Sequence, residues 1–234
     1  MNALKPFILT AFLLACTGQA GQAQSCKPIS QFEGLFFDAG AFVGDQNMER
    51  NLENALLYRV EKVVLFPAPV TQPANRPRAL EKVFPDLVIQ GASPWSKASP
   101  VIWPEPLDIT MFGSLADEMV RHPDRTYLIS HLSRFDPKRL SKLLEKAPNL
   151  WLGLSWEDLK ILNKQCANGP LQSLVDQADG RLVFASFGRD QNWQNYKKTI
   201  QSLRNYIALL SEQKGEAIAF RNAEHLYKVA VNAP

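Results

Sequence analysis

The stretch of sequence that decides the fold is Tyr127-Leu128-Ile129-Ser130-His131-Leu132-Ser133-Arg134. A short apolar run ends here in polar side chains, and Asp136-Pro137 then marks a helix start, with Asp at the N-cap and Pro at the first helical position. A buried strand that presents polar groups at its carboxyl end is typical of α/β folds, which place their active sites there. We therefore expect His131 and Arg134 to lie at the functional end of a parallel sheet.

Strand-like and helix-like patterns alternate along the rest of the chain. Near-continuous apolar strands separated by amphipathic helices are typical of a parallel sheet with helices outside it. The predicted strands lie at residues 35–37, 62–66, 87–89, 101–103, 127–130, 150–154 and 181–187. The predicted helices lie at residues 45–60, 78–84, 108–121, 136–147, 191–211 and 214–230.

The length of the chain limits the architecture. It has 234 residues, whereas a full eight-stranded barrel usually needs about 250. Prolines interrupt residues 93–106, so the middle of the chain is the least regular part. We therefore expect an α/β fold, a TIM-like barrel that is trimmed or irregular, with parallel strands and outer helices.

Residues 1–23 predict a secretory signal peptide rather than a part of the fold. Lys5 precedes the apolar run Phe7–Ala15, which is too short to span a bilayer, and Gly21–Ala23 offers small residues for cleavage. We expect residues 24–234 to form a single domain in the periplasm or outside the cell.

The cysteines bear on the same question of compartment. Leu13-Leu14-Ala15-Cys16 resembles a bacterial lipobox, so an alternative is a lipoprotein anchored to the membrane at an acylated Cys16. Cys26 and Cys166 remain after either form of processing. In an oxidising compartment two such thiols are expected to pair, which predicts a disulfide between them.

The charge distribution argues against nucleic acid as a partner. The formal net charge is only +3, from 26 Lys and Arg against 23 Asp and Glu. The basic residues are scattered and form no stripe, which a nucleic-acid interface would need. The sequence also contains no P-loop, Rossmann glycine pattern or G-x-S-x-G motif.

The order of the segments resembles the amidohydrolase-related branch of the amidohydrolase superfamily, the metal-dependent TIM-barrel hydrolases and decarboxylases. The resemblance covers residues 34–228. It is carried, in this order, by Phe37-Asp38-Ala39, Val60–Phe66, His122–Arg134, Pro148–Trp156, Arg181–Ser186 and Arg221–Tyr227. It implies a barrel whose site lies at the carboxyl ends of the strands.

The sequence departs from this family at the expected metal ligands. The family's first strand ends in D-x-H-x-H, and here it reads Asp38-Ala39-Gly40-Ala41-Phe42. Trp103 stands in place of a further His, and Ser186-Phe187 replaces the Thr/Ser-Asp pair of the last strand, so that only His131 matches a family ligand. A catalytic zinc needs about three protein ligands and an open position. We therefore expect no metal at this site and no other cofactor.

The remaining polar residues are candidates for a site that works without metal. His131 and Asp38 are the candidate acid and base, and Arg134 is the candidate clamp for a substrate carboxylate. Each has a structural alternative: His131 in a polar network, Asp38 bonded to a nearby backbone amide, and Arg134 paired with Asp136, Asp158 or Asp190. The further candidates for ligand binding are Glu105, Trp103, Trp156 and Arg189.

Two functions remain open. The first is an exported, catalytically inactive or metal-independent protein that binds a small molecule or a partner at the strand ends. The second is a metal-independent hydrolase or lactonase that acts on a small carboxylate-bearing substrate. A mouth filled by Phe42, Trp103 and Phe187 favours the first, whereas a pocket that brings His131 close to Asp38 or Glu105 favours the second.

Overall fold

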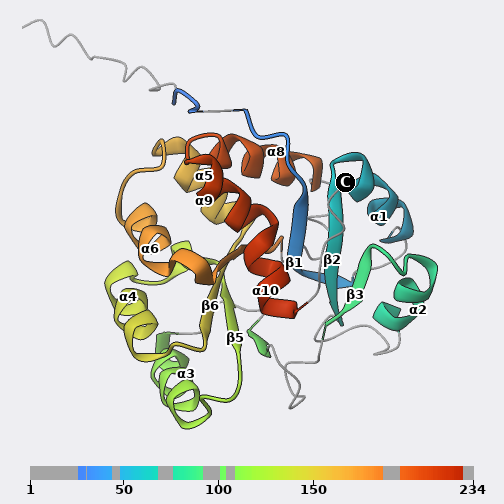
Figure 1. Cartoon of the computed structure of the whole chain (residues 1–234). Coiled ribbons are helices and arrows are strands. Elements are labelled where there is room, and N and C mark those ends of the chain that lie inside the picture. Colours follow the sequence, from blue (N-terminus) through green and yellow to red (C-terminus); the bar gives the residue numbers. More distant parts are fainter. Residues whose placement is uncertain are drawn as a thin grey trace, which may run out of the picture.

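The structure is a computed structural model that describes residues 26–29, 31–43, 48–67, 76–91, 101–103, 109–186 and 196–228 (Figure 1). Its strands are β1 Phe36–Val43, β2 Val60–Pro67, β3 Val88–Gln90, β4 Val101–Trp103, β5 Tyr127–Ser130, β6 Leu150–Leu154 and β7 Leu182–Phe184. Its helices are α1 Met48–Leu57, α2 Arg76–Val83, α3 Ile109–Arg121, α4 Pro137–Lys146, α5 Trp156–Lys164, α6 Pro170–Ala178, α8 Tyr196–Ile207, α9 Glu212–Glu216 and α10 Asn222–Tyr227. Short helical segments are η1 Leu132–Arg134, η2 Asp179–Arg181 and η3 Ala217–Arg221, the last a π-helix.

The predicted α/β class with parallel strands is confirmed. One sheet has the order β1-β2-β3 and the other the order β4-β5-β6-β7, and every pairing in them is parallel. Within the described residues the two sheets do not close into a barrel. A register irregularity between Asp38 and Ala41 interrupts the pairing of β1 with β2.

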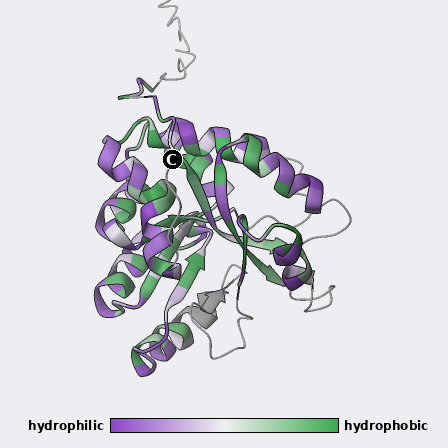
Figure 2. Cartoon of the chain, turned by 45° about the vertical axis from the view of Figure 1, so that its right-hand side comes forward, coloured by the Kyte–Doolittle hydropathy of each residue, from purple (hydrophilic) through white to green (hydrophobic). Residues whose placement is uncertain are grey.

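The strands bury both of their faces. Along β6, Leu150, Leu152 and Leu154 belong to a first cluster together with residues of α1, α4, α5, α6 and α8, whereas Trp151 belongs to a second cluster. The same alternation holds along β5 and β7, as the two-residue period of a strand requires. Figure 2 shows that the central strands are mostly hydrophobic, whereas the helices around them carry both hydrophobic and hydrophilic residues.

The last helix covers the second cluster. Ala223 is fully buried in it, and Leu226 and Tyr227 pack against it. The Tyr227 ring stacks on Phe37 at a centroid distance of 5.8 Å, and its hydroxyl donates to the carbonyl of Ala39. In Figure 1, α10 accordingly lies beside β1. The face of the strands that would line a barrel is therefore packed with apolar side chains at this point.

An N-terminal segment, residues 26–35, crosses α8 before it enters β1. A disulfide joins Cys26 to Cys166, as the sequence predicted. The Arg204 guanidinium of α8 donates to the carbonyl of Phe32 at 3.0 Å, and the Phe32 ring packs against Phe36. The segment is thus held at its beginning by a covalent bond and at its end by packing. No helix in the described part of the chain is long and apolar enough to cross a membrane.

Gly91 follows β3 in close contact with an aromatic ring. Its N–H donates to the Leu65 carbonyl, and a Cβ added here would lie 2.4 Å from Cε1 of Phe66. Gly91→Ala is expected to lower the free energy of unfolding by about 1–3 kcal/mol, because the buried ring must move. Gly113 in α3 is the matched control: no described atom would lie within 4 Å of a Cβ there, and alanine is expected to stabilise by about 1 kcal/mol. Urea unfolding of both variants measures the difference, and an unchanged Gly91→Ala protein would contradict the close packing.

Candidate functional site

Polar side chains gather at the carboxyl ends of β5, β6 and β7 and on the neighbouring strand β1. Asp38 lies within β1, Ser130 ends β5 and is followed by His131, and Ser155 and Ser186 follow β6 and β7. Because parallel strands all point the same way, these residues lie at one edge of the sheets, where an α/β fold places its site. Asp38, Ser130, Ser155 and Ser186 are buried, and His131 is partly exposed.

Asp38 links β1 to β7 and α8. Its Oδ1 accepts hydrogen bonds from the backbone N–H of Ser186 at 2.9 Å and of Gly40 at 3.2 Å, and its Oδ2 accepts one from the Tyr196 hydroxyl at 3.2 Å. The first of these bonds crosses between the two sheets. The bond to Gly40 is the structural alternative that the sequence offered, a carboxylate bonded to a nearby backbone amide. In this arrangement Asp38 acts as a buried connection between elements.

Burial decides the proton affinity of this carboxyl group. Removal from water raises the pKa of Asp38 from 3.8 to about 6, while its bonds to Ser186, Gly40 and Tyr196 act in the opposite direction. The charge of Asp38 also helps burial to raise the pKa of the Tyr196 hydroxyl well above 10. A carboxyl group with a pKa near neutrality suits a general base, but this one is fully enclosed by its hydrogen-bond donors.

His131 pairs with Glu157, a residue that was not among the predicted site residues. Its Nδ1 lies 3.3 Å from Oε2 of Glu157, the second residue of α5. The His131 side chain is 13% exposed and that of Glu157 is 37% exposed, so the pair lies at the surface of the strand ends. The contact with His131 is the main cause that lowers the pKa of Glu157 from 4.5 to about 2. Glu157 is therefore ionised over the whole physiological range.

The backbone at His131 is strained. Its φ of 56° and ψ of 52° fall in the left-handed region, which a residue with a Cβ seldom occupies and which costs of order 1–3 kcal/mol. Asp158 holds the next turn in place, since its carboxylate accepts from the backbone N–H of Leu132 at 3.1 Å and of Ser133 at 2.7 Å. The end of β5 is thereby tied to the start of α5.

Asp158 also completes a capping box. The Ser155 side chain accepts from the N–H of Asp158, and the Asp158 carboxylate accepts from the backbone and hydroxyl of Ser155 at 2.9 and 2.7 Å. The order Ser155-Trp156-Glu157-Asp158 carries the signal for such a box, with Asp in the position of the usual Glu or Gln. Asp158 was predicted as one possible partner for Arg134, whereas in the structure it bonds to the backbone of η1 and to Ser155.

The other predicted site residues make no described contact with Asp38 or with the pair of His131 and Glu157. Arg134 lies at the end of η1 with an exposed side chain. Trp156 is half-buried at the first position of α5, with the Lys160 ammonium 5.3 Å from the centre of its ring. Trp103 ends β4, but its side chain is outside the described part of the chain. Glu105 and Arg189 also lie outside the described residues, as does Phe187.

The structure does not bring the predicted acid–base pair together. Asp38 lies on β1 and His131 follows β5, with β7 and β6 between them, and the partner of His131 is Glu157 whereas Asp38 bonds to Ser186, Gly40 and Tyr196. Phe42 is almost fully buried and packs against Phe66 in the second cluster, which agrees with its predicted role as a plug. Of the three side chains predicted to fill the mouth, Phe42 is the one that the structure describes.

These residues do not fit the divalent metal of the related family. Among the residues that the structure describes, no group of three or more His, Cys, Asp and Glu side chains converges as metal ligands would. Asp38 directs both carboxylate oxygens at protein donors, and Gly40 and Phe42 offer no side-chain lone pair. The donor set at this edge supports hydrogen bonding and proton exchange instead.

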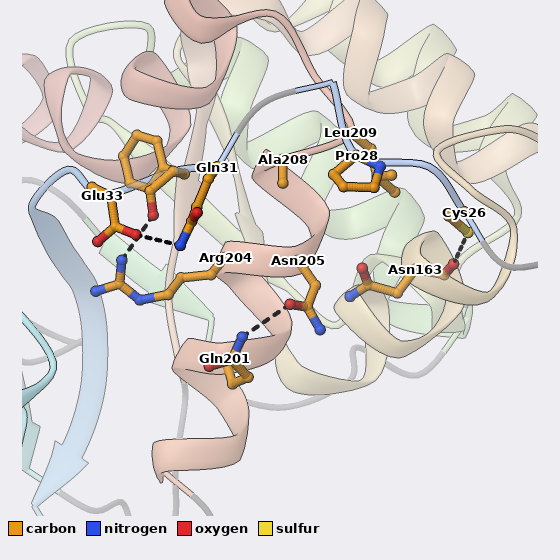
Figure 3. A pocket seen from close by; sticks show the side chains of 11 residues that line it. Cys26, Pro28, Gln31, Glu33, Asn163, Gln201, Arg204, Asn205, Ala208 and Leu209 are labelled. Carbon is orange, nitrogen blue, oxygen red and sulfur yellow. Dashed lines mark hydrogen bonds between the residues drawn. The ribbon is translucent and has the colours of Figure 1, made fainter.

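A groove of about 690 Å³ lies elsewhere, between the N-terminal segment and α8 (Figure 3). Its polar groups bond mainly to one another: Gln201 donates to Asn205, and Gln31 donates to Glu33. Arg204 donates to the Tyr58 carbonyl, just before β2, so the groove lies toward the amino ends of the strands. It is therefore separate from the polar residues at the carboxyl ends.

The pair formed by His131 and Glu157 contributes modestly to stability. The pKa of Glu157 is lower in the folded chain than in the unfolded one, so its contribution is present above pH 4.5 and is lost as pH falls toward 2. Because the side chain is 37% exposed, solvent screening leaves about 1 kcal/mol, which Glu157→Gln should remove at pH 7. Glu118→Gln is the comparison variant, since it removes a carboxylate that lies 3.4 Å from His122 and that also pairs with Arg121 and Arg125 on the surface of α3. Chemical unfolding at pH 7 and pH 3 tests this, and a loss in Glu157→Gln that is the same at both values would contradict it.

Comparison with known proteins identifies amidohydrolases among solved structures. No protein-family model matches the chain, and no curated protein matches it significantly. The chain is similar to Amidohydrolase 2 from Bifidobacterium longum subsp. infantis, at 13% identity and a TM-score of 0.49, over 84% of this chain and 100% of that one. It is also similar to an amidohydrolase from Burkholderia multivorans solved with bound zinc, at 12% identity and a TM-score of 0.46, over the same shares of the two chains. Both neighbours carry the name amidohydrolase, which is also the superfamily that the sequence resembles.

Proposed function

We propose that this chain is an exported, amidohydrolase-like protein that binds a small molecule or a partner at the carboxyl ends of its strands and does not perform metal-dependent hydrolysis. The observation that carries this proposal is the state of Asp38. A carboxylate that would face a metal in the related family is here buried and bonded to Ser186, Gly40 and Tyr196. The neighbouring positions Gly40 and Phe42 supply no ligand.

The architecture that we propose is a trimmed TIM-like barrel. The bond from Ser186 to Asp38 lies between β7 and β1, which also contact each other, and it supports the continuous order β3-β2-β1-β7-β6-β5-β4. Burial of both faces of these strands supports the same proposal, because the inner face of a barrel is a packed core.

Export is supported by the disulfide and by the N-terminal pattern. The bond between Cys26 and Cys166 suits a periplasmic or extracellular location, because such bonds persist in oxidising compartments. The signal-like residues 1–23 lie outside the described residues, as does Cys16, whose acylation remains the alternative route to a membrane-anchored form.

A hydrolysis assay tests the absence of metal-dependent catalysis. The purified mature protein would be incubated with aryl esters, lactones and amides, with and without added zinc, beside His131→Ala. We expect product formation at the rate of the buffer control in every case. Turnover that depends on zinc would overturn the proposal, whereas turnover without metal that His131→Ala abolishes would replace binding alone by the second candidate function below.

The second candidate is a metal-independent hydrolase or lactonase that acts on a small carboxylate-bearing substrate. The contact between His131 and Glu157 favours it, because a carboxylate beside an imidazole supports proton transfer. In this function Glu157, rather than Asp38, would be the carboxylate partner of His131, and the exposed Arg134 would meet the substrate carboxylate. Turnover of a carboxylated lactone without metal, lost in His131→Ala, would establish it.

A further inference from the structure

We propose that the groove between the N-terminal segment and α8 binds a neutral compound rich in hydroxyl groups, such as a short oligosaccharide. The groove has a volume of about 690 Å³, within the range of about 300–1,000 Å³ in which proteins enclose small ligands. It lies toward the amino ends of the strands, so this inference goes beyond the proposed function and does not rest on it. Gln201 and Asn205 of α8 are the residues that we assign to the hydroxyl groups of the ligand.

Gln201 and Asn205 have hydrogen-bonding groups that the protein does not use. They lie one turn apart on α8, both are exposed, and both line the groove (Figure 3). Gln201 Nε2 donates to Asn205 Oδ1 at 3.0 Å, and neither Gln201 Oε1 nor Asn205 Nδ2 has a hydrogen bond to another described residue. The pair therefore offers an acceptor and a donor side by side, a pattern that two neighbouring hydroxyl groups of a sugar satisfy together.

A similar pair on α6 shows what a purely structural arrangement looks like. Gln172 donates to Asp176, one turn later, at 2.8 Å. Gln172 Oε1 also accepts from the Tyr206 hydroxyl, and the Asp176 carboxylate also accepts from Lys214, so other protein groups use what this pair offers. The pair on α8 has no such further partners in the described part of the chain, so water or a ligand must satisfy it.

The charges in the groove are balanced and already engaged. Glu33 and Arg204 are the charged residues among those that line it. The guanidinium of Arg204 donates to the carbonyls of Phe32 and Tyr58, both at 3.0 Å. Glu33 accepts from Gln31 at 2.7 Å, and its charge attracts Arg204. A charged ligand would find no unengaged counter-charge among the described lining residues, so the groove favours a ligand without net charge.

Apolar side chains form the rest of the lining. Pro28 and Phe32 come from the N-terminal segment, and Ala208 and Leu209 follow α8. A few polar groups set among apolar side chains are typical of small-molecule sites. A sugar ring suits such a lining, because its C–H faces are apolar while its edge carries the hydroxyl groups.

An extended peptide is the alternative neutral ligand, since its backbone also carries donors and acceptors. Such a peptide typically binds by pairing with a free backbone edge. The N-terminal segment uses the N–H of Ile29 for a bond to the carbonyl of Ala208. The unused groups of the groove thus belong to side chains, which favours the sugar.

The disulfide holds one wall of the groove in place. Cys26 lines the groove and is joined to Cys166, and the bond from Ile29 to Ala208 fixes the segment three residues further on. A wall that is ordered before the ligand arrives lowers the entropy cost of binding. Binding should therefore weaken when the disulfide is removed.

An NMR titration of the complete mature, oxidised protein tests the proposal. The probes are maltotriose, cellotriose and diacetylchitobiose, added to isotope-labelled protein. The side-chain amide signals of Gln201 and Asn205 would be assigned from Gln201→Ala and Asn205→Ala. We expect one of these sugars to shift both signals to saturation, and each variant to bind that sugar about fivefold to tenfold more weakly. Gln177→Ala is the matched control, since it removes an exposed carboxamide of α6 outside the groove, and it should bind as the unmodified protein does.

The cross-link and two comparison ligands complete the test. Cys26→Ser/Cys166→Ser should bind the sugar about fivefold more weakly than the oxidised protein. The blocked peptide acetyl-trialanine amide and the anionic sugar digalacturonate should leave the signals of Gln201 and Asn205 unchanged. If none of the three neutral sugars shifts these signals, or if the peptide shifts them instead, the proposal is wrong. Sugar binding that is equally strong in Gln201→Ala and Asn205→Ala would also overturn it. The hydrolysis assay is independent of all these results, so the proposed function stands or fails separately.

Discussion

Asp38→Ala is expected to lower the free energy of unfolding by about 3–5 kcal/mol, because three buried donors lose their acceptor. Those donors are the backbone N–H groups of Ser186 and Gly40 and the Tyr196 hydroxyl. The bond from Ser186 joins β7 to β1, so its loss also weakens the connection between the two sheets. Urea unfolding at pH 7 measures the effect. Asp136→Ala is the matched control: Asp136 caps α4 through one exposed bond to Lys138, and its loss should cost about 1 kcal/mol.

Asp38→Asn separates the hydrogen bonds from the charge. An amide keeps an oxygen for the two N–H groups and can donate to Tyr196, so most of the connection survives. The pKa of Asp38 is raised in the folded protein, from 3.8 to about 6, so its favourable contribution is complete below pH 4 and is lost as pH rises through 6. The stability of Asp38→Asn minus that of the unmodified protein should therefore increase by up to about 3 kcal/mol between pH 4 and pH 7.

Comparing Asp38→Asn with the unmodified protein tests whether Asp38 is a buried carboxylate that holds the fold. Unfolding curves of both proteins across this pH range give the difference between their free energies of unfolding. The titration of other groups, such as Glu157, cancels in this difference. A difference that stays flat would show that Asp38 is not buried as described. An Asp38→Asn protein that is as unstable as Asp38→Ala would contradict the hydrogen-bond arrangement.

Removal of the disulfide is the second large effect that we expect. Cys26 and Cys166 are 140 positions apart, and the chain-entropy estimate for so long a loop is about 5 kcal/mol. Because measured losses are usually smaller, we expect Cys26→Ser/Cys166→Ser to be about 3–5 kcal/mol less stable than the oxidised protein. Unfolding with and without reductant measures this.

The reduced, unmodified protein is the control for the double serine variant. Both lack the cross-link, so they should unfold at the same denaturant concentration, whereas reductant should not change the variant. The bonds from Arg204 to the carbonyls of Phe32 and Tyr58 remain in both, so the core should persist while residues 26–31 become accessible to protease. A loss of stability below about 1 kcal/mol would contradict the role assigned to the cross-link.

Much of the fold follows from local sequence patterns. The Asp136-Pro137 start of α4 forms as predicted, with the Asp136 side chain accepting from the N–H of Lys138. The apolar runs at Tyr127–Ser130 and Leu150–Leu154 form buried parallel strands, since such runs fit a sheet covered on both faces. Helix α6, Pro170–Ala178, was not predicted, although Gly169-Pro170 resembles a helix start with Pro at its first position.

The contacts of the site could not be predicted in the same way. That Asp38 meets Ser186 depends on strands 148 positions apart, for which a single sequence has no signal. Helix α5 was not among the predicted helices, and the pairing of Glu157 with His131 and of Asp158 with the backbone of η1 depends on the direction in which α5 leaves β6. Sequence thus predicted the edge where polar residues gather, and tertiary packing determined the pairs.

The central claim is that the polar groups at the strand ends hold the fold together instead of binding a metal. The metal content of the protein tests this claim most directly. The mature protein would be purified without chelator, dialysed, and examined by elemental analysis, and its thermal unfolding would be followed during a titration with zinc. The account predicts less than stoichiometric transition metal and an unchanged unfolding temperature. One equivalent of zinc per chain that survives dialysis, with stabilisation that is lost in Asp38→Asn or His131→Gln, would contradict it.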